Sequence, residues 1–345
     1  MNQDLVLVTG ATGYVARHCI TQLLERGYKV RGTLRSMARA SQTASAITGA
    51  LKARERIADL SFVEAQLTNA PDWAATMAGV RFVLHVAAPL PAKSPKSDDE
   101  LIAPAREGAL NIMRAAAAAG VERVVQTSSA AAISYGCEAP NHRVFTEQDW
   151  SDPNHPDNSA YTRSKTLAEL AVWETLPTLS CALEWVTINP GLVLGPVLDR
   201  DASASVLVVA KLLKGEMPGV PRLAWQIVDV RDIADLHIRA MTTPAAAGQR
   251  YIGSADFITM FEISQMLKRE LGVAGAKAPQ IRLPDWLVRI VGLMDKEVGG
   301  VTFELGRERH LSSAKARSEL GWTTRPAQAT ILDTATSLAR VGALA

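Results

Sequence analysis

The sequence predicts an α/β protein with a doubly wound parallel sheet and a smaller, mostly helical C-terminal lobe. Two observations support this prediction. Short apolar segments alternate with segments of helical periodicity over the first 190 residues, and a glycine-rich turn joins the first apolar segment to the first helical one. Strands that alternate with helices are typical of a parallel sheet covered by helices on both faces.

Six apolar segments are the predicted strands of this sheet. They are short and rich in Val, Leu and Ile, as expected of parallel strands buried on both faces. The segments are Leu5–Val8, Lys29–Leu34, Leu60–Val63, Phe82–Val86, Arg123–Gln126 and Trp185–Ile188. The helical patterns that separate them are Tyr14–Glu25, Ala38–Leu51, Asp72–Met77, Leu101–Ala119 and Ala160–Glu174.

The alternation loosens after Pro190, where a second part of the chain begins. We predict helices at Ala204–Lys214 and Ile233–Met241 and strands at Gln226–Val230 and Arg250–Ile252. The last ninety residues are predicted to be mostly helical, with Trp286 and Trp322 packed inside. Late strands are expected to return to the sheet. The predicted sheet domain therefore comprises residues 1–189 and 224–255, and the smaller lobe comprises 190–223 and 256–345.

Composition and charge exclude several classes of protein. The 345 residues are 48% hydrophobic and 21% charged, which is typical of a globular chain and not of a disordered one. The net charge is only +2 and no basic block occurs, so neither nucleic acid nor a membrane surface is an expected partner. No signal peptide or apolar span is recognisable. The sequence leaves open whether the chain is a monomer or a homodimer.

Cysteine and histidine usage indicates neither disulfides nor a metal site. Cys19, Cys137 and Cys181 are odd in number, far apart and outside any CxxC pattern. The six histidines show no spacing of three or four residues that would pair them as ligands. We therefore expect a soluble protein of the reducing cytoplasm without a bound metal ion.

The turn Thr9–Ala16 predicts a dinucleotide-binding site, as in Rossmann-like folds. It lies between a strand and a helix and reads TGATGYVA. Gly10 permits a tight turn, Gly13 allows close approach of a pyrophosphate, and the small Ala16 lets the helix pack against the strand. The phosphates would lie at the positive N-terminus of the helix.

The end of the second strand predicts NADP rather than NAD. NAD-binding folds place a carboxylate there to hold the ribose 2′-hydroxyl, but no Asp or Glu occurs from Lys29 to Ala40. Arg35 and Arg39 are present instead and suit the 2′-phosphate of NADP. The alternative is that both arginines are only solvated surface residues.

Tyr161 and Lys165 are the predicted reacting pair. They form a YxxxK at the start of a helical segment, so both side chains lie on one face of the helix. A neighbouring ammonium group favours a phenolate and makes the phenol a usable proton donor. Ser128 and Ser129 follow a predicted parallel strand, at the edge where such sheets bind ligands, although either serine could merely cap a turn.

These segments together resemble those of the extended short-chain dehydrogenases/reductases. The resemblance is strongest to the dihydroflavonol 4-reductase-like group, which includes NADPH-dependent aldehyde and ketone reductases. It runs from about Leu5 to Trp322 and also covers His85–Pro89, Glu147–Asp152, Asn189–Pro196 and Val228–Asp232. The resemblance implies an oxidoreductase that reduces a carbonyl to an alcohol.

The resemblance also implies the residues of the site. Ser129, Tyr161 and Lys165 would be catalytic. The cofactor would contact the turn (Gly10, Thr12, Gly13, Tyr14, Val15), Arg35, Arg39, Gln66, Leu67, Val86, Ala87, Ala88, Thr127, Tyr161, Lys165, Pro190, Gly191 and Val193. The substrate would contact Leu90, Ile133, Ser134, Leu192 and Trp225, which suggests an apolar pocket with few polar anchors.

The chain departs from the group's pattern at two positions. Relatives often carry Asp-Leu where this chain has Gln66-Leu67, so the adenine contact would run through an amide. The plant flavonoid reductases have an asparagine that holds the flavonoid ring, and the matching residue here is Ser134. This second departure argues against a flavonoid substrate.

Two alternative functions remain open from the sequence. A sugar-nucleotide epimerase or dehydratase shares the fold and the three catalytic residues and keeps NAD bound. The dehydratases place acidic residues after the serine segment, where this chain has Ala130–Ala132, and Arg35 disfavours NAD. A redox-sensing regulator would bind NADP without catalysis, but such proteins typically lack the YxxxK pair.

Overall fold

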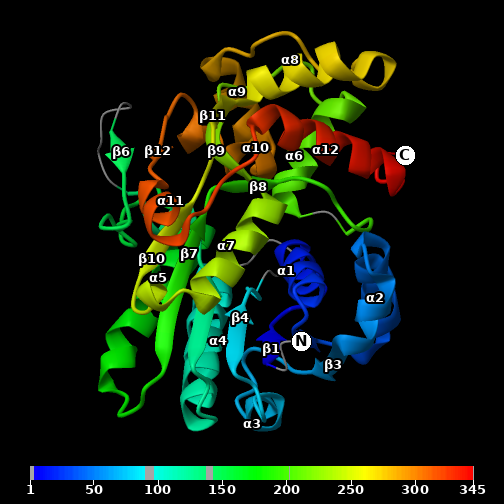
Figure 1. The fold of residues 1–345 in the computed structure, drawn as a ribbon. Coiled ribbons are helices and arrows are strands. Elements are labelled where there is room, and N and C mark those ends of the chain that lie inside the picture. The colour runs from blue at the N-terminus through cyan, green and yellow to red at the C-terminus, as the bar shows by residue number, and fades with distance from the viewer. Residues whose placement is uncertain (1–3, 90–96, 137–142, 202, 345) are drawn as a thin grey trace.

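A seven-stranded parallel sheet forms the larger part of the molecule (Figure 1). The computed structural model describes residues 4–89, 97–136, 143–201 and 203–344. The strands, in spatial order, are β10 (Arg250–Gly253), β7 (Glu184–Pro190), β5 (Arg123–Thr127), β4 (Phe82–His85), β1 (Leu5–Val8), β2 (Lys29–Leu34) and β3 (Leu60–Glu64). The chain order reverses between β1 and β4, and ligands of doubly wound sheets bind outside the carboxyl ends of the strands at such a point.

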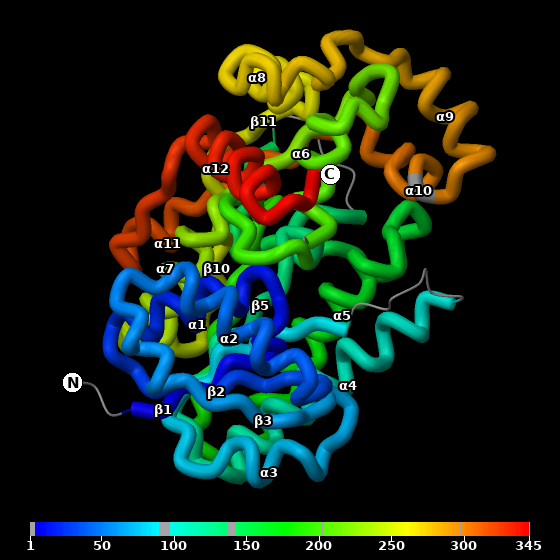
Figure 2. Tube along the Cα trace, turned by 90° about the vertical axis from the view of Figure 1, so that its right-hand side faces the viewer, coloured from blue at the N-terminus to red at the C-terminus, as the bar shows by residue number. Residues whose placement is uncertain are grey.

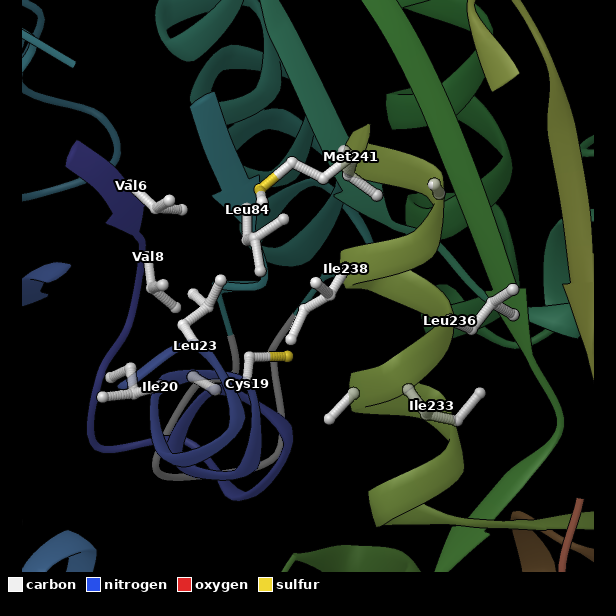
Figure 3. Packing of buried hydrophobic residues seen from close by; sticks show 14 of the residues in the cluster. Val6, Val8, Cys19, Ile20, Leu23, Leu84, Ile233, Leu236, Ile238 and Met241 are labelled. Carbon is white, nitrogen blue, oxygen red and sulfur yellow. The ribbon is translucent and has the colours of Figure 1, made fainter. Parts of the chain in front are cut away.

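Helices cover both faces of this sheet. On one face lie α1 (Tyr14–Glu25), α2 (Ala40–Ala50) and α7 (Val230–Thr242), and on the other lie α3 (Asp72–Thr76), α4 (Asp99–Ala118) and α5 (Ala160–Thr175). The period of two along β1 sorts its side chains between the faces. Val6 and Val8 pack with α1 and α7, as Figure 3 shows, whereas Leu7 packs with α4.

The C-terminal lobe lies at the upper end of the molecule in Figures 1 and 2. A three-stranded sheet of β8 (Leu192–Leu194), β9 (Ala224–Asp229) and β11 (Phe257–Thr259) packs with helices of the lobe. These helices are α6 (Ala204–Lys214), α8 (Met260–Leu271), α9 (Asp285–Met294) and α12 (Ala327–Arg340). The shorter elements are α10 (Lys296–Gly299), α11 (Ala314–Leu320) and the pair β6 (Val144–Phe145) and β12 (His310–Leu311).

The predicted fold class is confirmed, with two differences in detail. All six predicted strands are present in the large sheet. The segment from residue 224, which we assigned to the sheet domain, begins with β9, and β9 pairs with β8 and β11 instead. Trp322 is buried as expected, and its indole N–H donates to the carbonyl of Asp232 over 2.8 Å. The prediction for Trp286 was wrong: it lies on the outer side of α9, where its side chain is 64% exposed.

Among the described residues, no helix has the length and apolar character needed to cross a membrane.

Candidate active site

The turn after β1 has the geometry of a nucleotide-binding loop. Gly10 adopts φ +68°, a conformation that favours glycine, and a Cβ there would lie 2.9 Å from the Cβ of Ala87. The backbone N–H of Gly10 donates to the Thr33 hydroxyl over 2.9 Å, and the N–H of Ala11 donates to the Thr33 carbonyl over 2.8 Å. The turn is therefore fixed against β2 and against the segment that follows β4.

The N-terminus of α1 fits a pyrophosphate. Gly13 is its N-cap residue, no side chain caps the helix, and the first turn holds no acidic residue. The N-terminal N–H groups and the helix dipole therefore have no competing anion from these residues. Thr12 and Val15 beside Gly13 are partly buried. The predicted contact Tyr14 uses its hydroxyl within the protein, where it donates to the carbonyl of Gly195 over 2.8 Å.

The two predicted phosphate-binding arginines have different environments. Arg35, directly after β2, is exposed, and its side chain has no hydrogen bond or ion pair with any described residue. Arg39 ends the short helix η1 (Met37–Arg39) and forms an ion pair with Asp201 of the lobe. Arg35 is thus available to an incoming phosphate, whereas Arg39 must exchange one anionic partner for another.

One carboxylate at this site was missed by the sequence analysis. Glu64, the last residue of β3, accepts a hydrogen bond from the backbone N–H of Met37 over 3.0 Å. Parallel pairing places Glu64 beside Leu34, and sequence spacing alone does not reveal that pairing.

Other residues predicted to contact the cofactor follow β3 and β4. The N–H of Ala87 donates to the Thr9 hydroxyl over 3.0 Å, which fixes the segment containing Val86 and Ala88 to the turn. Gln66 follows β3 and is exposed. Leu67 is partly buried against Gly108 of α4, where a Cβ on the glycine would meet the leucine at 3.1 Å.

The two serines after β5 have opposite orientations. The hydroxyl of Ser128 is buried and donates to the Glu169 carboxylate over 2.5 Å. Ser129 is partly exposed, and its hydroxyl accepts from the N–H of Ala131 over 3.1 Å, as the N-cap of η3 (Ala130–Ala132). This contact orients the Ser129 oxygen and leaves its proton without an acceptor among the described residues. Only Ser129 can therefore donate to a ligand.

Helix α5 presents Tyr161 and Lys165 at the same edge. The helix begins beside them because the Ser159 hydroxyl caps it, accepting from the N–H of Thr162 over 3.2 Å. The Tyr161 side chain is 43% exposed, and its hydroxyl has no partner among the described residues. The Lys165 ammonium donates to the carbonyl of Thr127 over 3.3 Å, which holds it at the end of β5.

Thr127 is held in turn by a residue that the sequence analysis did not assign. Its hydroxyl lies 2.7 Å from Nε2 of His237, and Nδ1 of His237 lies 2.8 Å from the carbonyl of Ile233. Burial lowers the pKa of His237 to about 4, so the ring is neutral. Because a carbonyl can only accept, Nδ1 carries the proton and Nε2 accepts from Thr127.

The end of β7 and the start of β8 carry the predicted cofactor residues Pro190, Gly191 and Val193. The N–H of Gly191 donates to the carbonyl of Gly253 over 3.1 Å, and Pro190 pairs with Gly253 at the end of β10. A Cβ at Gly191 would lie 2.3 Å from the carbonyl oxygen of Gln226, so a side chain does not fit there. Val193, on β8, is partly buried.

The predicted substrate residues do not all face one space. Ile133 is fully buried against Phe145, Ile252 and Leu311. The Ser134 hydroxyl is directed back to the carbonyl of Ala130 over 3.3 Å. Leu192 and Trp225 are partly buried beside the core of the lobe, and Leu90 lies outside the described residues.

A polar group that the sequence analysis missed lies beside this segment. The guanidinium of Arg309 stacks on the ring of Tyr135 at 3.9 Å, and its Nε donates to the carbonyl of Ser134 over 3.0 Å. Burial, followed by the Glu304 carboxylate, raises the pKa of Tyr135. Arg309 also pairs with Glu304. The expected apolar wall therefore adjoins a charged pair, which sequence periodicity could not indicate.

A small cavity joins several of the predicted residues across the fold. It is lined by groups from the ends of β4 and β5 and from α4 and α5, among them Ala87, Ala88, Thr127, Tyr161 and Lys165. Residues as far apart in sequence as Ala87 and Lys165 thus meet at one place. Among the residues that the structure describes, no group of three His, Cys, Asp or Glu side chains is arranged to hold a metal ion.

A comparison with models of protein families assigns the chain to a family. The model of the NAD dependent epimerase/dehydratase family matches residues 6–252, well over half of the chain. The chain belongs to this family. Its members are the extended short-chain dehydrogenases/reductases, so the predicted resemblance is confirmed.

Relatives of known description within the epimerase/dehydratase family include several reductases. The chain is 36% identical over 269 residues to cinnamoyl-CoA reductase 2 of Arabidopsis thaliana, covering 77% of each chain. It is 32% identical to dihydroflavonol 4-reductase of Zea mays over 93% of this chain and 84% of the other. The solved structure of the yeast methylglyoxal/isovaleraldehyde reductase Gre2 with NADPH is also similar, with a TM-score of 0.81 and 27% identity over 98% of this chain and 99% of that one.

Proposed function

We propose that this protein is an NADPH-dependent carbonyl reductase that converts an aldehyde or ketone to an alcohol. One observation carries the proposal: two hydroxyl donors, Ser129 and Tyr161, have no acceptor among the described residues, and both lie within four residues of the Thr127–Lys165 contact that anchors an ammonium group. Two unsatisfied donors at a ligand-binding edge suit an oxygen that gains negative charge during reaction. The reductase relatives and the NADPH-bound neighbour support the same assignment.

The residues of the site act on the carbonyl oxygen. Bound NADPH supplies the hydride that forms the new C–H bond. Ser129 donates a hydrogen bond to the carbonyl oxygen and so holds the carbonyl carbon of the substrate in position to receive the hydride. Tyr161 donates a second hydrogen bond and transfers its proton to that oxygen, so the product is a neutral alcohol. Lys165 stabilises the phenolate that this transfer leaves behind.

The structure around α1 and β2 supports NADP(H) as the cofactor. The first turn of α1 has no competing anion, and Arg35 offers an unpaired guanidinium. Arg35 and Arg39 would hold the 2′-phosphate, and the turn at Gly10 and Gly13 would hold the pyrophosphate. The Glu64 carboxylate, beside Leu34 at the end of β2, already accepts a hydrogen bond from the N–H of Met37.

The test measures NADPH consumption with a panel of aromatic and aliphatic aldehydes, ketones and β-keto esters. We expect turnover with at least one class, and we expect Tyr161→Phe to lower kcat at least about 1000-fold because the proton donor is lost. The affinity for NADPH, measured by fluorescence titration, should change less than about threefold.

Tyr251→Phe is the matched control for this experiment. The Tyr251 hydroxyl donates to Glu319 over 2.7 Å, outside the predicted site, so its loss should leave kcat within about twofold. Retained turnover in Tyr161→Phe would contradict the mechanism. NAD⁺ held tightly by the purified protein would instead favour an epimerase or dehydratase. The three residues directly after Ser129 are alanines, Ala130–Ala132 of η3, so they offer a dehydratase no carboxylate.

The proposed substrate pocket has an apolar side and a polar end. Leu192 and Trp225 would supply apolar contacts, and the Tyr135–Arg309 stack would supply the polar end of the pocket. A cytoplasmic location stays a prediction from the odd number of separated cysteines.

A further inference from the structure

A buried carboxylate lies two helical turns beyond the reacting tyrosine. Tyr161, Lys165 and Glu169 are spaced four residues apart on α5, so they lie along one side of the helix. Tyr161 is exposed at one end of this row, whereas Glu169 is fully buried at the other. The mechanism above does not use Glu169.

Three donors converge on this carboxylate from three adjacent strands. Ser128, after β5, donates over 2.5 Å; Asn189, on β7, donates over 2.8 Å; and Nε of Arg250, on β10, donates over 2.6 Å. The strands β10, β7 and β5 are neighbours in the sheet. Glu169 therefore ties the ends of three strands to the helix that carries Tyr161.

One of these donors reaches the catalytic serine itself. The same Nδ2 of Asn189 that donates to Glu169 also donates to the backbone carbonyl of Ser129 over 3.1 Å. Ser128, the residue before it, is bonded to Glu169 directly. The backbone of Ser129 is thus held through its own carbonyl and through the side chain of its neighbour.

The ion pair between Glu169 and Arg250 keeps this arrangement rigid. Arg250 is buried, its Nη1 donates to the carbonyls of Glu147 and Asp149 over 2.7 and 2.9 Å, and its guanidinium lies 3.6 Å from the centre of the Trp150 ring. A buried ion pair often adds little net stability compared with apolar residues of the same volume. Its directional bonds nevertheless fix the carboxylate in one orientation.

We propose that Glu169 is a positioning residue, which acts through Asn189 and Ser128 to fix Ser129 relative to Tyr161 and Lys165. The proposal rests on the carbonyl reductase function proposed above. Ser129 must present its hydroxyl to the same oxygen as Tyr161, and the two residues come from different elements. Glu169 joins the two elements through its bonds to Ser128 and Asn189.

The first test is a mutant cycle on kcat. Glu169→Gln keeps the side-chain volume, and Ser128→Ala removes one donor but leaves the Glu169–Arg250 ion pair. We expect kcat to fall about 10- to 100-fold in Glu169→Gln and several-fold in Ser128→Ala, with KM for NADPH changed less than about threefold. In a Ser129→Ala background each substitution should lower kcat by less than about twofold, since the group that it positions is gone.

The second test does not depend on turnover. Hydrogen exchange of the amides of residues 129–133, followed by mass spectrometry, should be about tenfold faster in Glu169→Gln and in Ser128→Ala than in the unmodified protein. Ser264→Ala is the control. This fully buried serine lies on α8 of the C-terminal lobe, and it donates to the carbonyl of Pro279 over 2.5 Å. It should change neither the exchange of residues 129–133 nor kcat.

Each outcome decides one of the two proposals. Equal reductions of kcat with and without Ser129, or unchanged exchange of residues 129–133, would overturn the positioning role. Absence of turnover in the unmodified protein over the whole carbonyl panel would overturn the reductase function instead, and the exchange measurement would then decide the positioning role alone. If Glu169→Gln does not fold, Ser128→Ala carries both tests.

Discussion

At the scale of single residues, the local environment decides which of several similar side chains can act. Ser128 and Ser129 are adjacent, yet the Ser128 hydroxyl donates to Glu169, whereas the Ser129 hydroxyl remains able to donate to a ligand. Arg35 and Arg39 are four residues apart, yet only Arg39 already has an anionic partner, Asp201. Residue type and spacing identify the candidates, and the contacts separate them.

The arginine contrast gives a prediction at this scale. We expect Arg35→Ala to raise KM for NADPH about 10- to 100-fold, because a charge-assisted contact to phosphate is worth about 1.5–3 kcal/mol. Arg39→Ala should raise it only a few-fold, since that side chain gives up Asp201 to reach the phosphate. KM for NADH should stay within about twofold in both variants. Equal effects of Arg35→Ala on the two cofactors would remove Arg35 from the phosphate site.

At the scale of helices and strands, amphipathic pattern predicts where an element lies but not always what covers it. Helix α7 packs against α1 and the sheet through Ile233, Ile238 and Met241, as Figure 3 shows. Helix α9 has a comparable apolar pattern, but Trp286 and Leu293 remain exposed, and Val288 is its buried residue. Among the described residues, no element covers the outer side of α9.

The two tryptophans test this difference between elements. Trp322→Ala should lower the free energy of unfolding by about 3–5 kcal/mol, because it leaves a cavity in the core and removes the bond to the Asp232 carbonyl. Trp286→Ala should lower it by less than about 1 kcal/mol, since most of that side chain is already in water. Urea unfolding of both variants measures the difference. A large decrease in the free energy of unfolding for Trp286→Ala would contradict this prediction and would indicate that Trp286 is buried in solution.

At the scale of the whole molecule, three neutral histidines are built into the interior of the sheet domain. Burial lowers the pKa of His18 and His237 to about 4 and that of His85 to about 3. His18 lies on α1 and its Nε2 bonds to the carbonyl of Pro196 over 2.9 Å, so it also joins the domain to the segment after β8. In the unfolded chain each ring would titrate near 6.5.

This difference predicts loss of stability in acid. Between pH 6.5 and 4 these histidines bind protons in the unfolded chain but stay neutral in the folded protein. The free energy of unfolding therefore falls as the pH is lowered through this range. The shift of His18 alone corresponds to about 3 kcal/mol. Urea unfolding at pH 7.5, 6 and 5 measures the slope. His18→Gln, which can still donate to Pro196, should flatten it. An unchanged slope in His18→Gln would contradict the assignment.

The positions of the main elements followed from local patterns in the chain. The glycine turn, the strands β1 to β5 and the helices α1 and α5 depend on residues that are neighbours in sequence, and the predicted ranges agree with them to within a few residues. The YxxxK pair could be found for the same reason, because four residues of one helix fix the relation of Tyr161 to Lys165.

The sequence by itself determined the fold class, and it indicated the proposed cofactor turn and the proposed reacting pair, Tyr161 and Lys165. Only the tertiary structure decided the polar groups around them: Glu64 beside the end of β2, Asp201 on Arg39, neutral His237 beside Thr127, and Glu169 bonded to Ser128. Each of these contacts joins segments that are 27 to 162 residues apart. Periodicity and capping act over a few residues, whereas a contact between distant segments depends on strand order and packing, which one sequence does not display.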